Sequence, residues 1–349
     1  MNLGQARGAA QPGPAAGHGP GAREADGRRP DRDVGSLVER LRDGDRRAVA
    51  RLISLVEDGD AWAGQLREVA EALNPSTGRA MVIGLTGSPG VGKSTLANAL
   101  VAAYRAAGRT VGVLAVDPSS PFTGGALLGD RVRMQHHALD QGVYIRSMAT
   151  RGHLGGLAWA TPQAVRVLDA AGCEVVLVET VGVGQAEVEV AGLADTTLVV
   201  LAPGFGDAVQ VAKAGILEVA DIFVVNKADK DGADTVARDL RQMLHLGEAG
   251  PWNVPVVRTA AERRSGVEEL VERIAAHRAH LEGSGELAER RRHRAAREIE
   301  ELALADLRAE LGEPGRGEAL DQLAERVAVG ELGPYSAADR LLARVRGEA

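Results

Sequence analysis

The chain has 349 residues, of which 45% are hydrophobic and only 3% aromatic, and this composition favours a large α/β domain with additions over an aromatic-rich β-sandwich. Its formal net charge of −7 argues against a general nucleic-acid binder, and its single cysteine, Cys173, excludes intramolecular disulfides and cysteine-rich zinc sites. No apolar run is long enough for a membrane span and the N-terminus lacks the apolar core of a signal peptide, so we expect a cytoplasmic protein with neither nucleic acid nor membrane as a partner.

The first predicted elements are a tail and a set of helices. Residues 1–34 are rich in glycine, alanine, proline and arginine and carry almost no large apolar side chains. Such a segment cannot bury enough surface to offset its chain entropy, so we predict a disordered tail over residues 1–34. From Ser36 to Leu73 apolar side chains recur at helical spacing, with a turn at Gly44, and this pattern predicts a helical N-terminal extension over residues 35–78.

The middle of the chain contains seven short runs rich in β-branched residues, with helical stretches between most of them. Most runs are nearly continuously apolar, as expected for strands that are buried on both faces. Strands that alternate with helices predict a mainly parallel, doubly wound sheet, which binds ligands at the carboxyl ends of its strands. We assign this α/β domain to residues 79–282. The predicted strands begin at Met81, Thr110, Val143, Glu174, Thr196, Ile222 and Val254.

After Gly266 the chain is predicted to be helical to its end. One helix covers SGVEELVERIAAHRAHLEG, and a longer, highly charged one covers GELAERRRHRAAREIEELALADLRAEL. Two short amphipathic segments follow, around residues 318–329 and 335–346. We therefore expect a separate helical C-terminal region over residues 283–349.

Residues 87–95 read GSPGVGKST and fit the phosphate-binding pattern G-x-x-x-x-G-K-[ST] in full. The stretch follows a predicted strand and opens a helix, so backbone N–H groups and the helix N-terminus favour phosphate binding there. Only four of the 41 basic residues are lysines, and Lys93 is one of them. A slim ammonium can reach the β- and γ-phosphates inside a tight loop where a planar guanidinium would be too bulky. The predicted nucleotide contacts are Gly87, Ser88, Pro89, Gly90, Val91, Gly92, Lys93, Ser94 and Thr95.

A magnesium site is expected beside this loop. The Ser94 hydroxyl is the ligand that the phosphate-binding pattern supplies, and further ligands should be acidic. Asp117 and Glu179 each end a predicted strand, and Asp130 lies in the glycine-containing loop GALLGDRVRM. We predict Ser94, Asp117, Asp130 and Glu179 as magnesium ligands, and Lys93, Asp117 and Glu179 as catalytic residues.

A second motif, Asn226-Lys227-Ala228-Asp229, stands at the end of the predicted strand IFVVN. A carboxylate at this place can accept hydrogen bonds from N1–H and the exocyclic amine of guanine, whereas adenine offers no such pair of donors. The lysine stem is expected to pack along the base. The stretch Thr259-Ala260-Ala261, after the last predicted strand, is a candidate for a further contact with the base. Together the two motifs predict a guanine-nucleotide site with GTP and GDP as ligands.

The residue that orients the attacking water is the least defined part of this site. Many GTPases carry D-x-x-G followed by a glutamine, but this chain reads Glu179-Thr180-Val181-Gly182 and continues with Val183. The nearest glutamine is Gln185, three residues past the glycine, and we include it among the catalytic candidates. We expect slow intrinsic hydrolysis that a partner accelerates by reshaping these loops.

The glutamate at position 179, the stretch VDPSSPFTGGALLGDRVRM and the stretch QVAKAGILEVADIFVVNKAD together resemble the MeaB/ArgK family over residues 36–346. The resemblance implies a G-protein chaperone that couples GTP hydrolysis to loading, protection or exchange of adenosylcobalamin in an acyl-CoA mutase. Methylmalonyl-CoA mutase is the first candidate, with isobutyryl-CoA and ethylmalonyl-CoA mutases left open. The family also implies a homodimer, which the C-terminal helices could supply. The loop at residues 204–207 departs from the commoner family pattern, and we expect Phe205 and its neighbours to sense the nucleotide or the partner.

Three alternatives stay open at this point. A nickel-delivering GTPase would need Cys and His ligands, and the chain offers one cysteine and the pair His136-His137. A small-molecule kinase would share the phosphate-binding loop, but the guanine motif argues against it. A binding module that uses GTP only for stability is the third alternative.

Overall fold

The computed structural model of the chain describes residues 33–57, 63–117, 137, 139–149, 160–180, 185–204, 218–246, 250–311 and 316–345. For Asp117 and Gln185 it describes the backbone and not the side chain. The predictions for residues 1–32, for Asp130 and for the loop at 205–207 lie outside the described residues.

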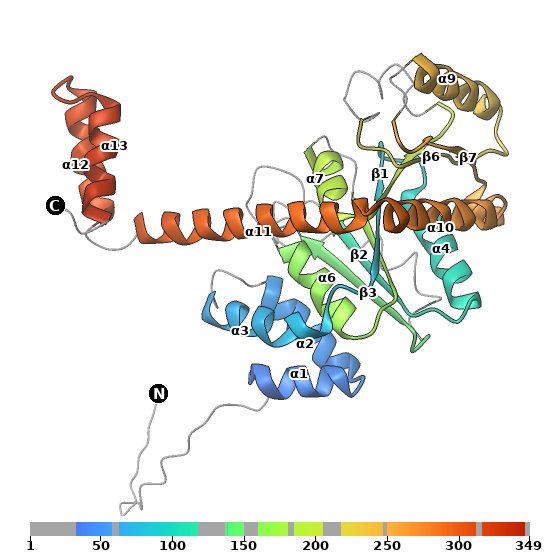
Figure 1. The fold of residues 1–349 in the computed structure, drawn as a ribbon, viewed down its shortest axis with the longest axis horizontal. Coiled ribbons are helices and arrows are strands. Elements are labelled where there is room, and N and C mark those ends of the chain that lie inside the picture. The colour runs from blue at the N-terminus through green and yellow to red at the C-terminus, as the bar shows by residue number, and fades with distance from the viewer. Residues whose placement is uncertain are drawn as a thin grey trace, which may run out of the picture.

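A seven-stranded sheet forms the centre of the molecule, with the order β3-β2-β4-β1-β5-β6-β7 (Figure 1). Every pair of neighbouring strands is parallel, which confirms the predicted doubly wound α/β fold. The predicted strands all form, because continuous apolar runs can bury both of their faces. The bounds are β1 (Met81–Thr86), β2 (Val111–Asp117), β3 (Val143–Ala149), β4 (Val175–Thr180), β5 (Thr196–Leu201), β6 (Ile222–Val225) and β7 (Val256–Arg258).

Helices cover both faces of this sheet. Side chains along a strand alternate between faces, so Val82 of β1 enters one hydrophobic cluster while Ile83 and Leu85 enter the other. A third cluster joins β5 and β6 to α9. The helices of the α/β layers are α4 (Lys93–Ala106) and α10 (Val267–Ser284) on one face, α6 (Ala160–Ala170) and α7 (Gln185–Leu193) on the other, and α9 (Ala233–Leu246) at the β6–β7 end.

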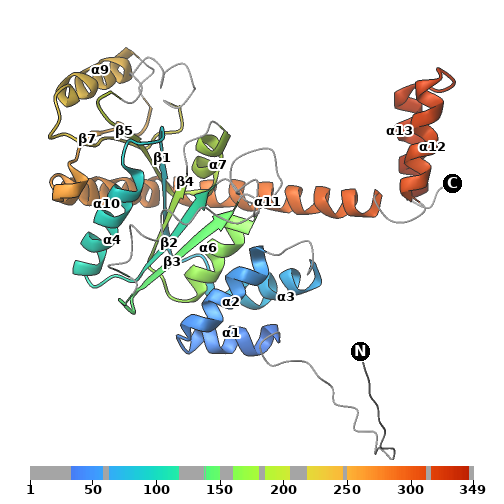
Figure 2. The ribbon, with the colours of Figure 1, turned by 180° about the vertical axis from the view of Figure 1, so that it is seen from behind.

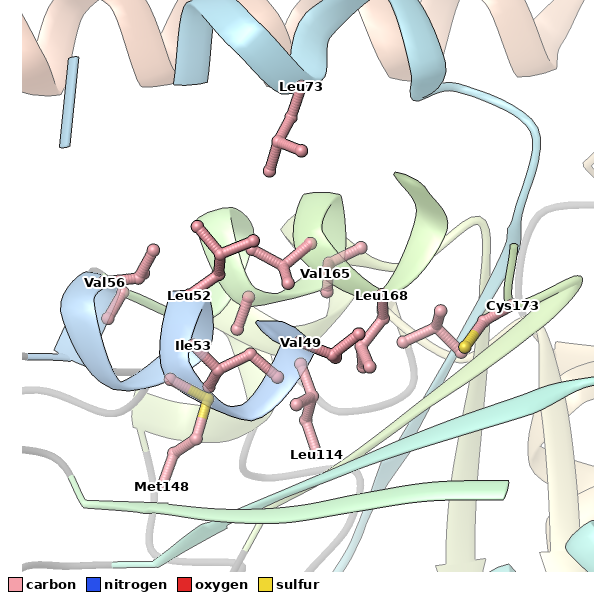
Figure 3. Close-up of a cluster of buried hydrophobic side chains, with 14 of the residues drawn as sticks. Val49, Leu52, Ile53, Val56, Leu73, Leu114, Met148, Val165, Leu168 and Cys173 are labelled. Atoms are coloured by element: carbon pink, nitrogen blue, oxygen red, sulfur yellow. The ribbon is translucent and has the colours of Figure 1, made fainter. Parts of the chain in front are cut away.

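The predicted N-terminal helices form α1 (Val34–Arg42), α2 (Arg46–Glu57) and α3 (Ala63–Leu73), followed by the short 3₁₀ helix η3 (Asn74–Ser76). The Asp33 carboxylate caps α1 by accepting a hydrogen bond from the Ser36 N–H, and Val34 is already buried, so the helix begins just before the predicted end of the tail. Figure 3 shows the apolar side of α2 packed over Val165 and Leu168 of α6 and Met148 of β3. The N-terminal helices therefore share one hydrophobic core with the sheet.

The C-terminal part is helical, as predicted, and consists of α11 (Glu286–Leu311), α12 (Arg316–Ala328) and α13 (Pro334–Val345). Helix α11 runs along the α/β body and then leaves it, and α12 and α13 pair as a hairpin that stands apart from the sheet (Figures 1 and 2). The predicted boundary at residue 282 falls within the last turn of α10. In the part of the chain that the structure describes, no helix combines the length and the apolar character needed to cross a bilayer.

Ion pairs fix the beginning of α11 to the amino-terminal edge of the sheet. Arg291 and Arg294 donate to the buried carboxylate of Asp195, with N···O distances of 2.9 and 3.1 Å. Arg290 donates to Asp221 at 3.0 Å. Because Asp195 directly precedes β5 and Asp221 directly precedes β6, these contacts lie at the edge opposite the loops that follow the strands.

The Asp195 cluster leads to a prediction about stability. Asp195→Ala leaves two guanidinium groups and the Val82 N–H without their shared acceptor, so we expect the free energy of unfolding to fall by about 3 kcal/mol. Denaturant unfolding measures this loss. Asp306→Ala is the matched control, since its pair with Arg67 is exposed and should contribute little.

The same cluster predicts a pH dependence. Burial alone raises the pKa of Asp195, but the hydrogen bond from Arg291 and the charges of Arg294 and Arg291 outweigh it and hold this pKa below its usual value. Since the pKa is lower in the folded than in the unfolded chain, the ionised carboxylate stabilises the fold fully above the usual carboxyl range. This contribution is lost as the pH falls through the lowered pKa. A difference between wild type and Asp195→Ala that grows toward acidic pH would contradict this account.

Candidate nucleotide-binding site

The glycine-rich loop follows β1, the central strand, at the carboxyl edge of the sheet. Gly87, Gly90 and Gly92 have φ values of 133°, 83° and 95°, in the left-handed region that side chains disfavour. A Cβ at Gly87 would lie 2.1 Å from the carbonyl oxygen of Val200 in β5. The loop therefore needs glycine for its backbone conformation and for its close approach to the neighbouring strand.

Lys93 is the first residue of α4 and is buried, with 6% of its surface exposed. Its Nζ donates to the carbonyl oxygens of Gly87 at 2.7 Å and Ser88 at 3.1 Å, so the ammonium is held inside the loop. Around it, Val91 is buried, Ser88 and Thr95 are half-buried, and Pro89 and Gly90 are exposed. The expectation that this position requires a slim cation stays a prediction, which the Lys93→Arg variant tests.

Two of the predicted magnesium ligands can be placed with their side chains, and they lie together. The Ser94 hydroxyl donates to Oε1 of Glu179 at 2.5 Å, and both residues are buried. They meet because β4 pairs with β1, with Glu179 opposite Leu85. Hydroxyl and carboxylate oxygens are the hard donors that Mg²⁺ prefers, so this pair fits the ion chemically.

Asp117 ends β2, the strand beside β4. The register sets Ala115 opposite Glu179, so the backbone of Asp117 lies two residues farther toward the carboxyl edge. This places Asp117 at the same edge as Ser94 and Glu179. Gln185 is the first residue of α7, which begins at this edge after β4.

Asn226 links three loops of the site. Its side-chain nitrogen donates to the Val91 carbonyl oxygen at 2.9 Å. Its side-chain oxygen accepts from the Thr259 hydroxyl at 3.1 Å and from the Ala261 N–H at 3.2 Å. The residue is 2% exposed, so all three contacts lie in the interior. No signal in the linear sequence indicates this link, because its partners lie more than 30 and about 135 residues away.

The rest of the second motif also faces the glycine-rich loop. Lys227 has a positive φ of 56°, and its Nζ donates to the Gly90 carbonyl oxygen at 2.7 Å. The Asp229 carboxylate lies 3.3 Å from the guanidinium of Arg263, a residue that sequence reasoning did not select. Thr259, Ala260 and Ala261 are buried. The structure thus brings both motifs to one edge of the sheet, as the sequence predicted for a single nucleotide site.

A parallel sheet with a glycine-rich loop after its central strand and a lysine at the start of the following helix defines the class of P-loop NTPases. Comparison with known protein families assigns the chain to one family within this class. The family model described as "Methylmalonyl Co-A mutase-associated GTPase MeaB" matches residues 49–314. The chain belongs to the MeaB family and is a GTPase, a hydrolase that acts on GTP.

Individual relatives agree with this assignment. A Pyrococcus abyssi protein named as a GTPase is 50% identical over 319 residues, which cover 90% of this chain and 97% of that one. The mouse mitochondrial methylmalonic aciduria type A homolog is 33% identical over 331 residues, covering 89% of this chain and 79% of that one. Among solved structures, an LAO/AO transport system kinase has a TM-score of 0.66 and 26% identity, covering 90% of this chain and 97% of that chain.

Proposed function

We propose that this GTPase is a chaperone that assists the loading and protection of an adenosylcobalamin-dependent acyl-CoA mutase, with methylmalonyl-CoA mutase as the first candidate. The observation that carries the proposal is the match of residues 49–314 to a family described as mutase-associated. The similarity to the methylmalonic aciduria type A homolog supports it. The alternatives of nickel delivery and small-molecule phosphorylation gain no support from the family.

In this proposal the glycine-rich loop binds the phosphates and the second motif binds the base. Backbone N–H groups of residues 87–95 and the N-terminus of α4 favour the phosphate charge. The Lys93 ammonium exchanges its loop carbonyl acceptors for oxygens of the β- and γ-phosphates. Asp229 accepts hydrogen bonds from guanine, while the loop at 259–261, held by Asn226, closes the base pocket.

Hydrolysis in this site depends on charge stabilisation and on the position of the water. Ser94 and Glu179, together with Asp117 and Asp130, are the proposed Mg²⁺ ligands, and the ion supplies positive charge to the phosphate oxygens. Val183, directly after the glycine at position 182, offers no side-chain hydrogen bond to a water. We therefore assign Gln185, at the start of α7, as the candidate that orients the water once a partner has rearranged the loops.

We further propose a homodimer formed through the C-terminal helices. The outer part of α11 and the α12–α13 hairpin expose large apolar side chains in a region that stands away from the α/β body (Figures 1 and 2). Burying such side chains against a second copy would remove apolar surface from water. The exposed side chains are Ile299, Leu302, Leu304, Leu307, Leu320, Val329, Tyr335 and Leu342.

Sedimentation velocity tests both assembly proposals. The full chain alone should sediment as a dimer. Mixed with adenosylcobalamin-dependent methylmalonyl-CoA mutase, it should form a faster complex whose amount differs between GDP and a non-hydrolysable GTP analogue. Absence of a complex with either nucleotide would contradict the proposed partner. We also propose that the GTPase and its mutase partner are located in the cytoplasm.

A further inference from the structure

Asp229 and Arg263 form an ion pair at the base-binding edge. The guanidinium Nη2 of Arg263 lies 3.3 Å from Oδ2 of Asp229. The Asp229 side chain is only 29% exposed, whereas the Arg263 side chain is 72% exposed. The pair therefore joins a half-buried carboxylate to a cation that reaches it from the solvent side.

The backbone fixes both ends of this pair. Arg263 ends the 3₁₀ helix η6 (Ala261–Arg263), and its N–H donates to the Ala260 carbonyl oxygen at 2.9 Å. The turn is closed by the next residue, Arg264, which has a positive φ of 56°. On the other side, the Ala228 N–H donates to the Thr259 carbonyl oxygen at 2.9 Å, so the segment before Asp229 is tied to the loop that carries Arg263.

A guanine base makes a strict demand on the carboxylate. Its N1–H and exocyclic amine lie in one plane, so both carboxylate oxygens must lie in that plane to accept both hydrogen bonds. An aspartate that is free to rotate would meet this demand only part of the time. A carboxylate has about four lone-pair sites, so a guanidinium can hold one oxygen while the base uses the others.

The ion pair with Arg263 is the side-chain interaction that the described residues give to Asp229. The cation thus orients the carboxylate and places a positive charge beside it.

We propose that Arg263 is a specificity-determining positioning residue, which holds the Asp229 carboxylate in the orientation that reads guanine. This inference rests on the proposed base-binding role of Asp229. Arg263 acts through Asp229 and takes no part in phosphate binding or hydrolysis. Its loss should therefore affect recognition of the base.

The test compares GDP with inosine diphosphate, which lacks the exocyclic amine and so needs only one acceptor. Calorimetry should find that Arg263→Ala weakens GDP binding by about two- to fivefold, within the range of a partly exposed ion pair. The affinity for inosine diphosphate should fall by a smaller factor, so the preference for GDP over inosine diphosphate should decrease. Arg263→Lys keeps the charge and should restore part of the preference. Arg273→Ala, at an exposed position of α10, removes the same charge and should change neither affinity.

Two results would overturn the inference. One is an unchanged preference for GDP in Arg263→Ala. The other is an equal loss of affinity for both nucleotides together with a lower melting temperature of Arg263→Ala, because this combination would indicate a structural role of the turn. Asp229→Asn separates this inference from the function on which it rests. If Asp229→Asn keeps the wild-type affinity for GDP, the proposed base site itself is wrong. If Asp229→Asn loses GDP affinity while Arg263→Ala keeps the wild-type affinity and preference for GDP, only the role of Arg263 is rejected.

Discussion

Replacing Lys93 with alanine is expected to abolish GTP hydrolysis, with a loss in rate of about 10³-fold or more. The ammonium is the cation that the structure holds inside the glycine-rich loop, between the carbonyl oxygens of Gly87 and Ser88. Without it, the charge that develops on the transferred phosphoryl group has one partner fewer in the transition state. Single-turnover release of phosphate measures the loss.

Arginine should not restore this activity. Lys93 is 6% exposed, and a Cβ at Gly87 or Gly92 would clash with Val200 or Asn226. The loop therefore cannot widen around a planar guanidinium without displacing buried groups. Lys93→Arg should therefore hydrolyse GTP as slowly as Lys93→Ala. Lys230→Ala, which removes an exposed lysine near the second motif, should retain wild-type activity. Full activity in Lys93→Arg would mean that charge alone is sufficient at this position.

Asp229→Asn is expected to exchange the base preference of the site. An amide cannot accept both protons of guanine, and a polar group that loses its partner costs a buried or half-buried site about 1–3 kcal/mol. The same amide can donate to O2 of xanthine. GDP affinity should therefore fall by about tenfold to a hundredfold, while xanthosine diphosphate gains affinity.

Calorimetry with the two nucleotides measures this exchange. Asp231→Asn is the matched control, because it changes an exposed carboxylate two residues away. The control should bind GDP as the wild type does. Two results would show that the base is recognised elsewhere: an Asp229→Asn variant that keeps its GDP affinity, or one that loses GDP affinity without gaining affinity for xanthosine diphosphate.

The α/β fold could be predicted because its strands are continuous apolar runs, which few other folds require. The seventh strand is the least accurate of these predictions. It was expected from Val254, but β7 begins at Val256, since Pro255 has no N–H to donate to a ladder. The order of the strands could not be derived from periodicity, because pairing depends on contacts between residues far apart in the chain.

The candidate site was predictable where a short motif carries its own chemistry, as in residues 87–95 and 226–229. Its connections were not. Asn226 was selected as a nucleotide contact, yet the structure makes it the link between the glycine-rich loop and the loop at 259–261. Arg263 was overlooked, because an arginine in a charged turn has no distinctive spacing and only the fold brings it to Asp229. The attachment of α11 through Asp195 and Asp221 likewise depends on tertiary contacts.

The measurement that tests the central claim most directly is single-turnover GTP hydrolysis, with and without adenosylcobalamin-dependent methylmalonyl-CoA mutase. The account predicts slow hydrolysis by the isolated chain, because the water has no orienting side chain directly after the glycine at position 182. Addition of the mutase should accelerate hydrolysis by about 10²-fold or more, the size of effect that positioning of a reactant produces. Gln185→Ala should lose this acceleration while keeping the slow basal rate. A fast rate for the isolated chain that the mutase leaves unchanged would contradict the account.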